Sequence, residues 1–87
     1  MNKLSKFKNC GFIKTTITGK LLYLVLYELA NRNGQVVISQ RKISNALGIS
    51  KSTVSRNLRR LERVGAIGIT PTFHYDGGRA ANKYTIK

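Results

Sequence analysis

The 87-residue sequence predicts one small α+β domain, mainly α, with three helices, a short strand and a C-terminal β-hairpin. Apolar residues recur at helical spacing in three segments, and a tight glycine-containing turn separates the last two. Towards the C-terminus, apolar residues alternate on both sides of an Asp-Gly-Gly turn, which is typical of a hairpin. No internal repeat or low-complexity tract indicates a second domain.

Residues 1–16 are expected to form a basic arm ahead of the domain at residues 17–87. The arm has four lysines, no acidic residue and no clear hydrophobic period. This composition is typical of a flexible segment that tracks phosphates or supports a dimer. Alternatively, Phe12 and Ile13 pack on the core as a short leading strand, or the terminus is an ordinary frayed end.

The first helix is expected at about residues 19–31, with Thr18 as its N-cap and Gly34 as the glycine that ends it. Apolar side chains cover most of its circumference, so it should be buried on more than one side. It then lies at the centre of the core or partly against a partner subunit. Tyr23 and Tyr27 are four residues apart and are expected mainly to pack in the core.

A short strand is expected at residues 36–38, followed by a second helix at about residues 40–47 that Ser39 caps. Gly48 closes this helix and Ser50 caps the next one. Two helices joined by a tight turn of about three residues that contains glycine have the spacing of a helix-turn-helix.

The third helix, at about residues 50–64, combines a narrow apolar seam with a broad cationic face. The seam consists of Val54, Leu58 and Leu61. At about 100° per residue, the side chains roughly opposite are those of Ser52, Arg56, Arg59 and Arg63. Solvated faces normally mix both charge signs, whereas arginine forks onto guanine edges or phosphates. The helix therefore favours a DNA groove over plain solvent exposure.

After Gly65 ends the third helix, two strands are expected to form a β-hairpin. Apolar residues alternate at Ile67, Ile69, Phe73 and Tyr75 in the first strand, and at Tyr84 and Ile86 in the second. Pro71 restricts the first strand to a sheet edge or breaks it. The turn Asp76-Gly77-Gly78-Arg79 tolerates positive φ and gives the hairpin a cationic tip.

The charge balance indicates an anionic partner. Sixteen Lys and Arg against three Asp and Glu give a formal net charge of +13, which repels itself unless a partner screens it. Nucleic acid is the first expectation, and an anionic membrane surface is the second. The apolar run at residues 21–30 is about half the length of a membrane span and contains Glu28, so no membrane insertion is expected.

The residue types do not favour enzymatic or metal-binding functions. Glu28, Glu62 and Asp76 are too scattered in the sequence to suggest a general acid–base pair. His74 and Cys10 are the sole histidine and cysteine, which leaves a metal site without ligands. A single cysteine also excludes an intramolecular disulfide and agrees with a cytoplasmic location. We expect no enzyme activity, no cofactor and no small-molecule ligand.

The string ISNALGISKSTVSRNLRRLERVGAI, residues 43–67, resembles the core of MarR-like and GntR-like regulators. With the tip Gly77-Gly78-Arg79, the chain is similar over residues 18–87 to the winged helix-turn-helix family of bacterial DNA-binding proteins. Phe12-Ile13-Lys14 and Asn82-Lys83-Tyr84 resemble somewhat more the winged helices of phage and plasmid replication or accessory proteins. The sequence departs from the MarR type in its dimerisation helix and from the GntR type in its effector domain, neither of which is present.

The resemblance implies that the third helix enters the major groove with its first half against base edges. The implied base readers are Ser52, Thr53, Ser55 and Arg56, although Thr53 could instead contact a phosphate. The implied backbone contacts come from Lys51, Arg59 and Arg60, and from the start of the second helix at Ser39, Gln40 and Arg41. In the wing tip, residues 76–80, Arg79 reaches the minor groove. Lys83 and Asn82 are weaker candidates on the same wing.

The sequence therefore predicts a double-stranded DNA-binding protein, first of all a sequence-specific transcription regulator, a repressor, of a bacterium, phage or plasmid. The alternatives are a DNA-binding module for replication or partition, and a protein- or membrane-interaction module. Specific sites usually contain two half-sites, so a weak homodimer is expected through the arm or the helix at residues 19–31. Such a protein would be cytoplasmic and associated with the nucleoid.

Overall fold

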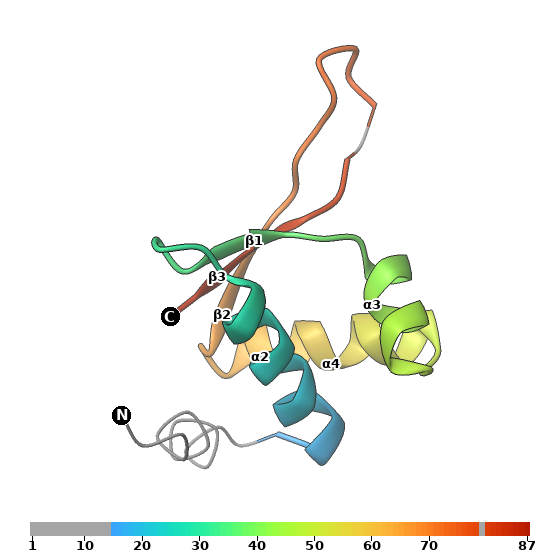
Figure 1. Ribbon diagram of the computed structural model, residues 1–87, viewed down its shortest axis with the longest axis vertical. Helices are drawn as coiled ribbons and strands as arrows, with labels where there is room; N and C mark the ends of the chain where they lie inside the picture. The colour runs from blue at the N-terminus through green and yellow to red at the C-terminus, as the bar shows by residue number, and fades with distance from the viewer. Residues whose placement is uncertain (1–14, 79) are drawn as a thin grey trace.

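The computed structural model describes residues 15–78 and 80–87, which form three helices and a three-stranded antiparallel sheet. In chain order the elements are α2 (Ile17–Leu29), β1 (Gln35–Val37), α3 (Gln40–Leu47), α4 (Lys51–Arg63), β2 (Ile67–Thr70) and β3 (Lys83–Ile86). The segment between β2 and β3 projects from this body as a long wing (Figure 1). The predicted mainly α winged helix-turn-helix is confirmed. The predictions for residues 1–14 and for Arg79 lie outside the described residues.

The sheet has the order β1-β3-β2, so the C-terminal strand is central. Tyr84 of β3 pairs with Val36 of β1 on one side and with Ile69 of β2 on the other. β1 begins one residue earlier than predicted, and the Ile38 N–H just after it donates to Asn82 O at 3.4 Å. Because β1 leads directly into α3, this pairing joins the base of the wing to the start of α3.

The core draws on every helix and on two strands. Its fully buried side chains are Leu22, Leu26, Ile43, Val54, Leu58, Leu61, Ile67 and Tyr84. The predicted seam of α4 is therefore confirmed. The burial predicted for α2 is realised only in part, because Leu21, Tyr27 and Leu29 are 45%, 39% and 52% exposed. No helix within the described residues is long and apolar enough to cross a membrane.

Helix α2 begins two residues earlier than the sequence suggested. Its N-cap is Thr16, whose Oγ1 accepts a hydrogen bond from the Gly19 N–H at 3.0 Å, and Thr18 lies inside the first turn. Gly19 is buried, and a Cβ at this position would collide with Thr15 Oγ1. The absence of a side chain at Gly19 therefore allows Thr15 to pack closely against α2.

Helix α2 also ends earlier than predicted, since Ala30 is already extended. The Asn31 side-chain oxygen accepts from the N–H groups of Asn33 and Gln35 at 2.9 and 3.0 Å. Gly34, at φ +74°, donates to Asn31 O at 2.9 Å in the same turn. Asparagine thus folds the chain back after the helix, and Gly34 serves the turn into β1 rather than the helix terminus.

The helix-turn-helix has the caps that were predicted. Ser39 and Ser50 accept from the third N–H of α3 and of α4 at 3.0 and 3.1 Å. Gly48 takes the left-handed conformation at φ +68° and donates to Ser44 O at 2.9 Å. This glycine ends α3 abruptly. Only a short turn therefore separates α3 from α4, and this turn fixes where the two helices cross.

The first strand of the predicted hairpin is shorter than expected. β2 stops at Thr70, before Pro71, which has no N–H to donate to a ladder. The alternation of apolar residues predicted to continue through Phe73 and Tyr75 does not face the core, because these side chains are 62% and 106% exposed. Beyond Pro71 the chain forms the arm of the wing instead.

The wing itself is closed by hydrogen bonds between its two arms. The Ala80 N–H donates to Thr72 O at 2.9 Å, and the Thr72 hydroxyl donates to Ala81 O. The predicted glycine turn is present, with Gly77 at φ +92°. The wing is therefore a hairpin whose returning arm leads straight into the central strand.

Candidate nucleic-acid interface

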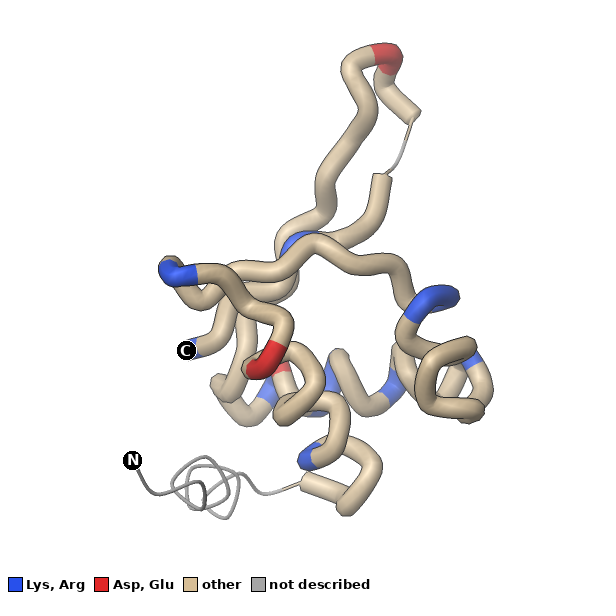
Figure 2. Tube along the Cα trace, viewed as in Figure 1, with Lys and Arg blue, Asp and Glu red and all other residues tan. Residues whose placement is uncertain are grey.

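The outer face of α4 is cationic, as the helical spacing predicted. Ser52, Arg56, Arg59 and Arg63 are all exposed, whereas Val54, Leu58 and Leu61 are fully buried. Lysines and arginines lie along α4 and at the start of α3, and an acidic residue lies at the tip of the wing (Figure 2). Most of the described cations thus lie on the two helices of the helix-turn-helix rather than at the described tip.

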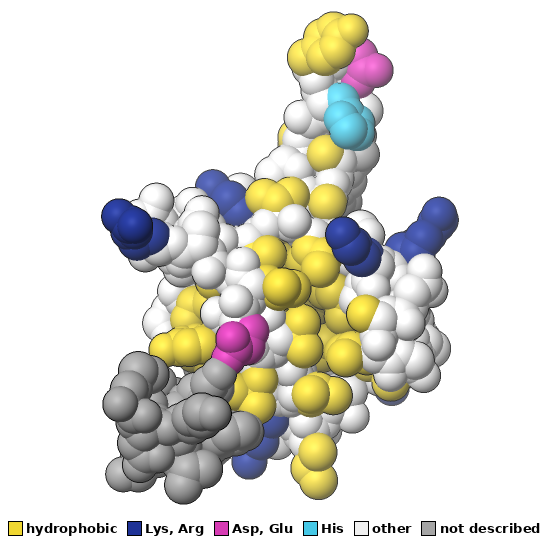
Figure 3. Space-filling model, viewed as in Figure 1, with side chains coloured by type: hydrophobic (Ala, Val, Ile, Leu, Met, Phe, Trp, Pro, Cys, Tyr) yellow, Lys and Arg dark blue, Asp and Glu magenta, His cyan; other side chains and the backbone are white. Residues whose placement is uncertain are grey.

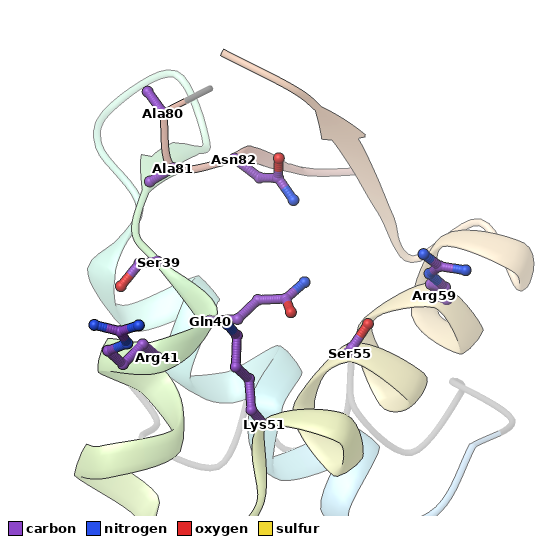
Figure 4. A pocket seen from close by; sticks show the side chains of 9 residues that line it. All are labelled: Ser39, Gln40, Arg41, Lys51, Ser55, Arg59, Ala80, Ala81 and Asn82. Atoms are coloured by element: carbon purple, nitrogen blue, oxygen red, sulfur yellow. The ribbon is translucent and has the colours of Figure 1, made fainter. Parts of the chain in front are cut away.

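A hollow of about 520 Å³ opens between α3, α4 and the returning arm of the wing. It is lined by Ser39, Gln40, Arg41, Lys51, Ser55, Arg59, Ala80, Ala81 and Asn82. Gln40 and Asn82 both point into it (Figure 4). Every residue that α3 and α4 contribute had been predicted to contact DNA, so the fold brings two separate predicted groups onto one surface.

A second hollow of about 460 Å³ continues along α4. It shares Gln40, Arg59 and Asn82 with the first and adds Arg63 and Glu62. We call the two together the α4 groove. Arg63, for which no specific contact was predicted, therefore belongs to this surface.

The other predicted residues lie outside the α4 groove: Ser52, Thr53, Arg56, Arg60 and Lys83. Ser52 and Arg56 are exposed elsewhere on α4, while Arg60 and Lys83 are half-buried. The Thr53 hydroxyl lies 2.7 Å from Ser50 Oγ, so it takes part in the cap of α4. This contact leaves it less available to a base than the sequence suggested.

Sequence reasoning overlooked Asn57, a 7% exposed side chain on the inner side of α4. The Thr16 hydroxyl donates to Asn57 Oδ1 at 2.7 Å, and Asn57 Nδ2 donates to Thr53 O at 2.8 Å. The buried amide is thereby satisfied, and it fixes the start of α2 to α4. A signal was present, because Asn57 lies three residues after Val54 and four before Leu61, on the apolar side.

A protein-family model described as a helix-turn-helix domain matches residues 15–67, which contain α2, α3 and α4. The chain belongs to this helix-turn-helix domain family. In the helix-turn-helix, the second helix of the motif lies in the major groove of DNA and the first crosses the backbone. The protein therefore has a helix-turn-helix DNA-binding domain, and α4 is the second helix of its motif.

Solved structures show the same fold around this helix-turn-helix. A possible transcriptional regulator from Methanosarcina mazei has a TM-score of 0.67 at 17% identity, over 94% of this chain. This chain spans 62% of the length of that protein. A protein of the archaeon Sulfolobus tokodaii has a TM-score of 0.64 at 22% identity, over 98% of this chain and 72% of its own. No curated protein matches the sequence.

Proposed function

We propose that this protein is a sequence-specific regulator of transcription that binds double-stranded DNA through α4 and acts as a repressor. The observation that carries the proposal is the α4 groove, where both helices of the motif and the wing present polar and cationic side chains to one surface. A major groove about 12 Å wide admits an α-helix. The fold shared with a possible transcriptional regulator of Methanosarcina mazei supports a regulatory role.

Base reading is assigned to the first half of α4. Ser52 and Arg56 are exposed, and Ser55 lines the α4 groove. Arginine offers a planar fork that matches the two acceptors of guanine, and serine allows a close approach. Thr53 is assigned to a phosphate, since its hydroxyl is already held near Ser50.

Backbone binding is assigned to residues on both sides of the readers. These residues are Ser39, Gln40 and Arg41 at the start of α3, Lys51, Arg59 and Arg60 on α4, and Lys83 on the wing, while Arg79 is assigned to the minor groove. Contacts of this kind set the register of the protein on the duplex but carry no sequence information. Repression then requires only that the bound protein occupies its site.

A weak homodimer on two half-sites is part of the proposal. Helix α2 leaves Ile17, Leu21 and Leu29 exposed by 86%, 45% and 52%. An apolar helix face of this kind suits a second copy, with the basic arm at residues 1–16 as a further contact. Two copies would place two α4 helices about one helical turn of DNA apart.

Selection of bound duplexes from a random pool, followed by mapping of the consensus onto the source genome, tests the proposal. A palindromic consensus that overlaps promoters is the expected outcome. Clustered repeats at an origin or a centromere-like locus would instead indicate replication or partition. The absence of measurable duplex affinity at low salt would exclude both and leave a protein- or membrane-interaction module.

A further inference from the structure

The tip of the wing presents an aromatic ring to solvent. The Tyr75 side chain is fully exposed, and Phe73 is 62% exposed. Hydrophobic surface caps the end of the wing, separate from the apolar surface of the body (Figure 3). An aromatic side chain buries about 150–250 Å² when it finds a partner. A ring held at the end of a projecting hairpin is therefore placed for contact with another molecule.

The turn that carries this ring is ordered by its own hydrogen bonds. The His74 N–H donates to Gly78 O at 2.6 Å, and the Gly77 N–H donates to His74 O at 2.9 Å. Asp76 Oδ1 accepts from the Gly78 N–H at 2.9 Å. The backbone and the carboxylate thus serve the turn, and Tyr75 stands on a defined platform, which lowers the entropy cost of a contact.

Charge narrows the kind of contact that the tip can make. Residues 73–78 contain Asp76 and neither lysine nor arginine, so electrostatic attraction to DNA at the tip depends on the neighbouring Arg79, and Tyr75 itself offers phosphates no charge. A base, in contrast, offers an uncharged π face on which an aromatic ring stacks. The returning arm of the wing lines the α4 groove through Ala80, Ala81 and Asn82. A duplex in that groove would therefore continue along the wing towards Tyr75.

We propose that Tyr75 is a wedge that enters the minor groove beside the site read by α4 and stacks on a base there. The proposal rests on DNA binding through α4 and adds one partly unstacked, bent base step to the complex. Apolar and aromatic wedges inserted from the minor groove kink a duplex by about 20–90°. Tyr75 would then contribute to specificity by favouring flexible steps such as TA and CA at this position.

Duplexes obtained by the selection above provide the first test, with one abasic site moved stepwise along the flank. The base step at an abasic site is already unstacked, so part of the free-energy cost of inserting Tyr75 is removed there. The wild-type chain should therefore prefer one position of the abasic site by about tenfold. Tyr75→Ala should lose this preference and bind the intact duplex about tenfold more weakly.

Fluorescence of 2-aminopurine at the same position provides the second test, since this base brightens when it unstacks. The wild-type chain and Tyr75→Phe, which keeps the ring, should both raise the fluorescence, whereas Tyr75→Ala should not. Phe73→Ala is the matched control for loss of an exposed ring on the same wing. Because Tyr75 is fully exposed, Tyr75→Ala and Tyr75→Phe should melt at the wild-type temperature.

The outcomes separate the wedge from DNA binding itself. A wild-type chain that binds its duplex without brightening any flanking 2-aminopurine would overturn the wedge alone. The same holds if Tyr75→Ala changes only self-association or contact with another protein. A wild-type chain without affinity for any duplex would overturn both the wedge and the proposed function.

Discussion

Arg56 and Asn57 are consecutive residues of α4 that serve opposite sides of it. Arg56 is exposed on the cationic face. Asn57 is 7% exposed on the inner side of α4, where its Oδ1 accepts a hydrogen bond from the Thr16 hydroxyl. Successive helical residues are about 100° apart, so one face can meet DNA while the neighbouring face is held by the core. The direction in which Arg56 points therefore depends on a buried amide away from the proposed interface.

The Asn57 contact predicts a loss of stability. Asn57→Ala removes two hydrogen bonds and leaves the Thr16 hydroxyl proton without its acceptor, so the free energy of unfolding should fall by about 1–3 kcal/mol in urea denaturation. Thr16→Ser keeps the hydroxyl and is the control. In a double-mutant cycle with Thr16→Val, the combined loss should be smaller than the sum of the single losses. Additive losses would show that the two side chains do not interact.

The Arg56 assignment predicts a change of specificity. Arg56→Ala should relax the base preference at one position of the selected site, at a cost of about 1–3 kcal/mol. Arg63→Ala, also exposed on α4 but in its last turn, should weaken all sequences alike. Competition binding against single-base variants of the consensus measures both. An unchanged preference in Arg56→Ala would mean that α4 is placed wrongly in the groove.

At the scale of elements, the sequence predicts helix starts well where one local cap dominates. Ser39 and Ser50 cap α3 and α4 as expected. At α2, Thr16 and Thr18 compete, and Thr16 is the residue that also bonds Asn57, 41 positions away. A partner so distant leaves no trace in local periodicity, so the boundary of α2 could not be read from the segment itself.

The α4 groove, too, could be predicted only in part from the local sequence. The helical residues that line its first hollow follow from caps and periodicity, and they were predicted, whereas Glu62 and Arg63 in the second hollow were not predicted to contact DNA. Asn82 joins them because β3 returns to pair with β1, which brings the base of the wing beside the start of α3. The partner strands of β3 depend on long-range packing, for which local alternation carries little information. Pro71 was expected either to confine the first hairpin strand to a sheet edge or to break it, and the break after Thr70 leaves Tyr75 exposed.

The turn between α3 and α4 carries a prediction at this scale. Gly48 has φ +68°, and a Cβ there would meet nothing within 4 Å. Gly48→Ala should therefore destabilise the fold by about 1 kcal/mol through backbone strain alone. Gly48→Asn should cost less, because asparagine tolerates this conformation. Chemical denaturation of both variants measures the difference, and equal losses would point to a steric cause.

At the scale of the whole molecule, the charges are arranged by region. The formal net charge is +13, and four cations of α3 and α4, namely Arg41, Lys51, Arg59 and Arg63, line the α4 groove, whereas an acidic residue lies at the tip of the wing. A uniformly positive surface would attract DNA in any orientation. The observed arrangement instead favours one orientation of the protein on DNA, with the α4 groove against the phosphate backbone and Tyr75 beyond it.

The salt dependence of duplex binding measures how much of the molecule meets the phosphate backbone. The cations proposed for that role are Arg41, Lys51, Arg59, Arg60 and Lys83. At about −0.9 per phosphate, these give a slope of about −4 to −5 in log K against log salt, measurable by fluorescence anisotropy. Arg41→Gln should reduce the magnitude of the slope by about 1. Arg32→Gln, in the turn between α2 and β1 and outside the α4 groove, should leave it unchanged. If both substitutions lowered the slope equally, net charge rather than the α4 groove would govern binding.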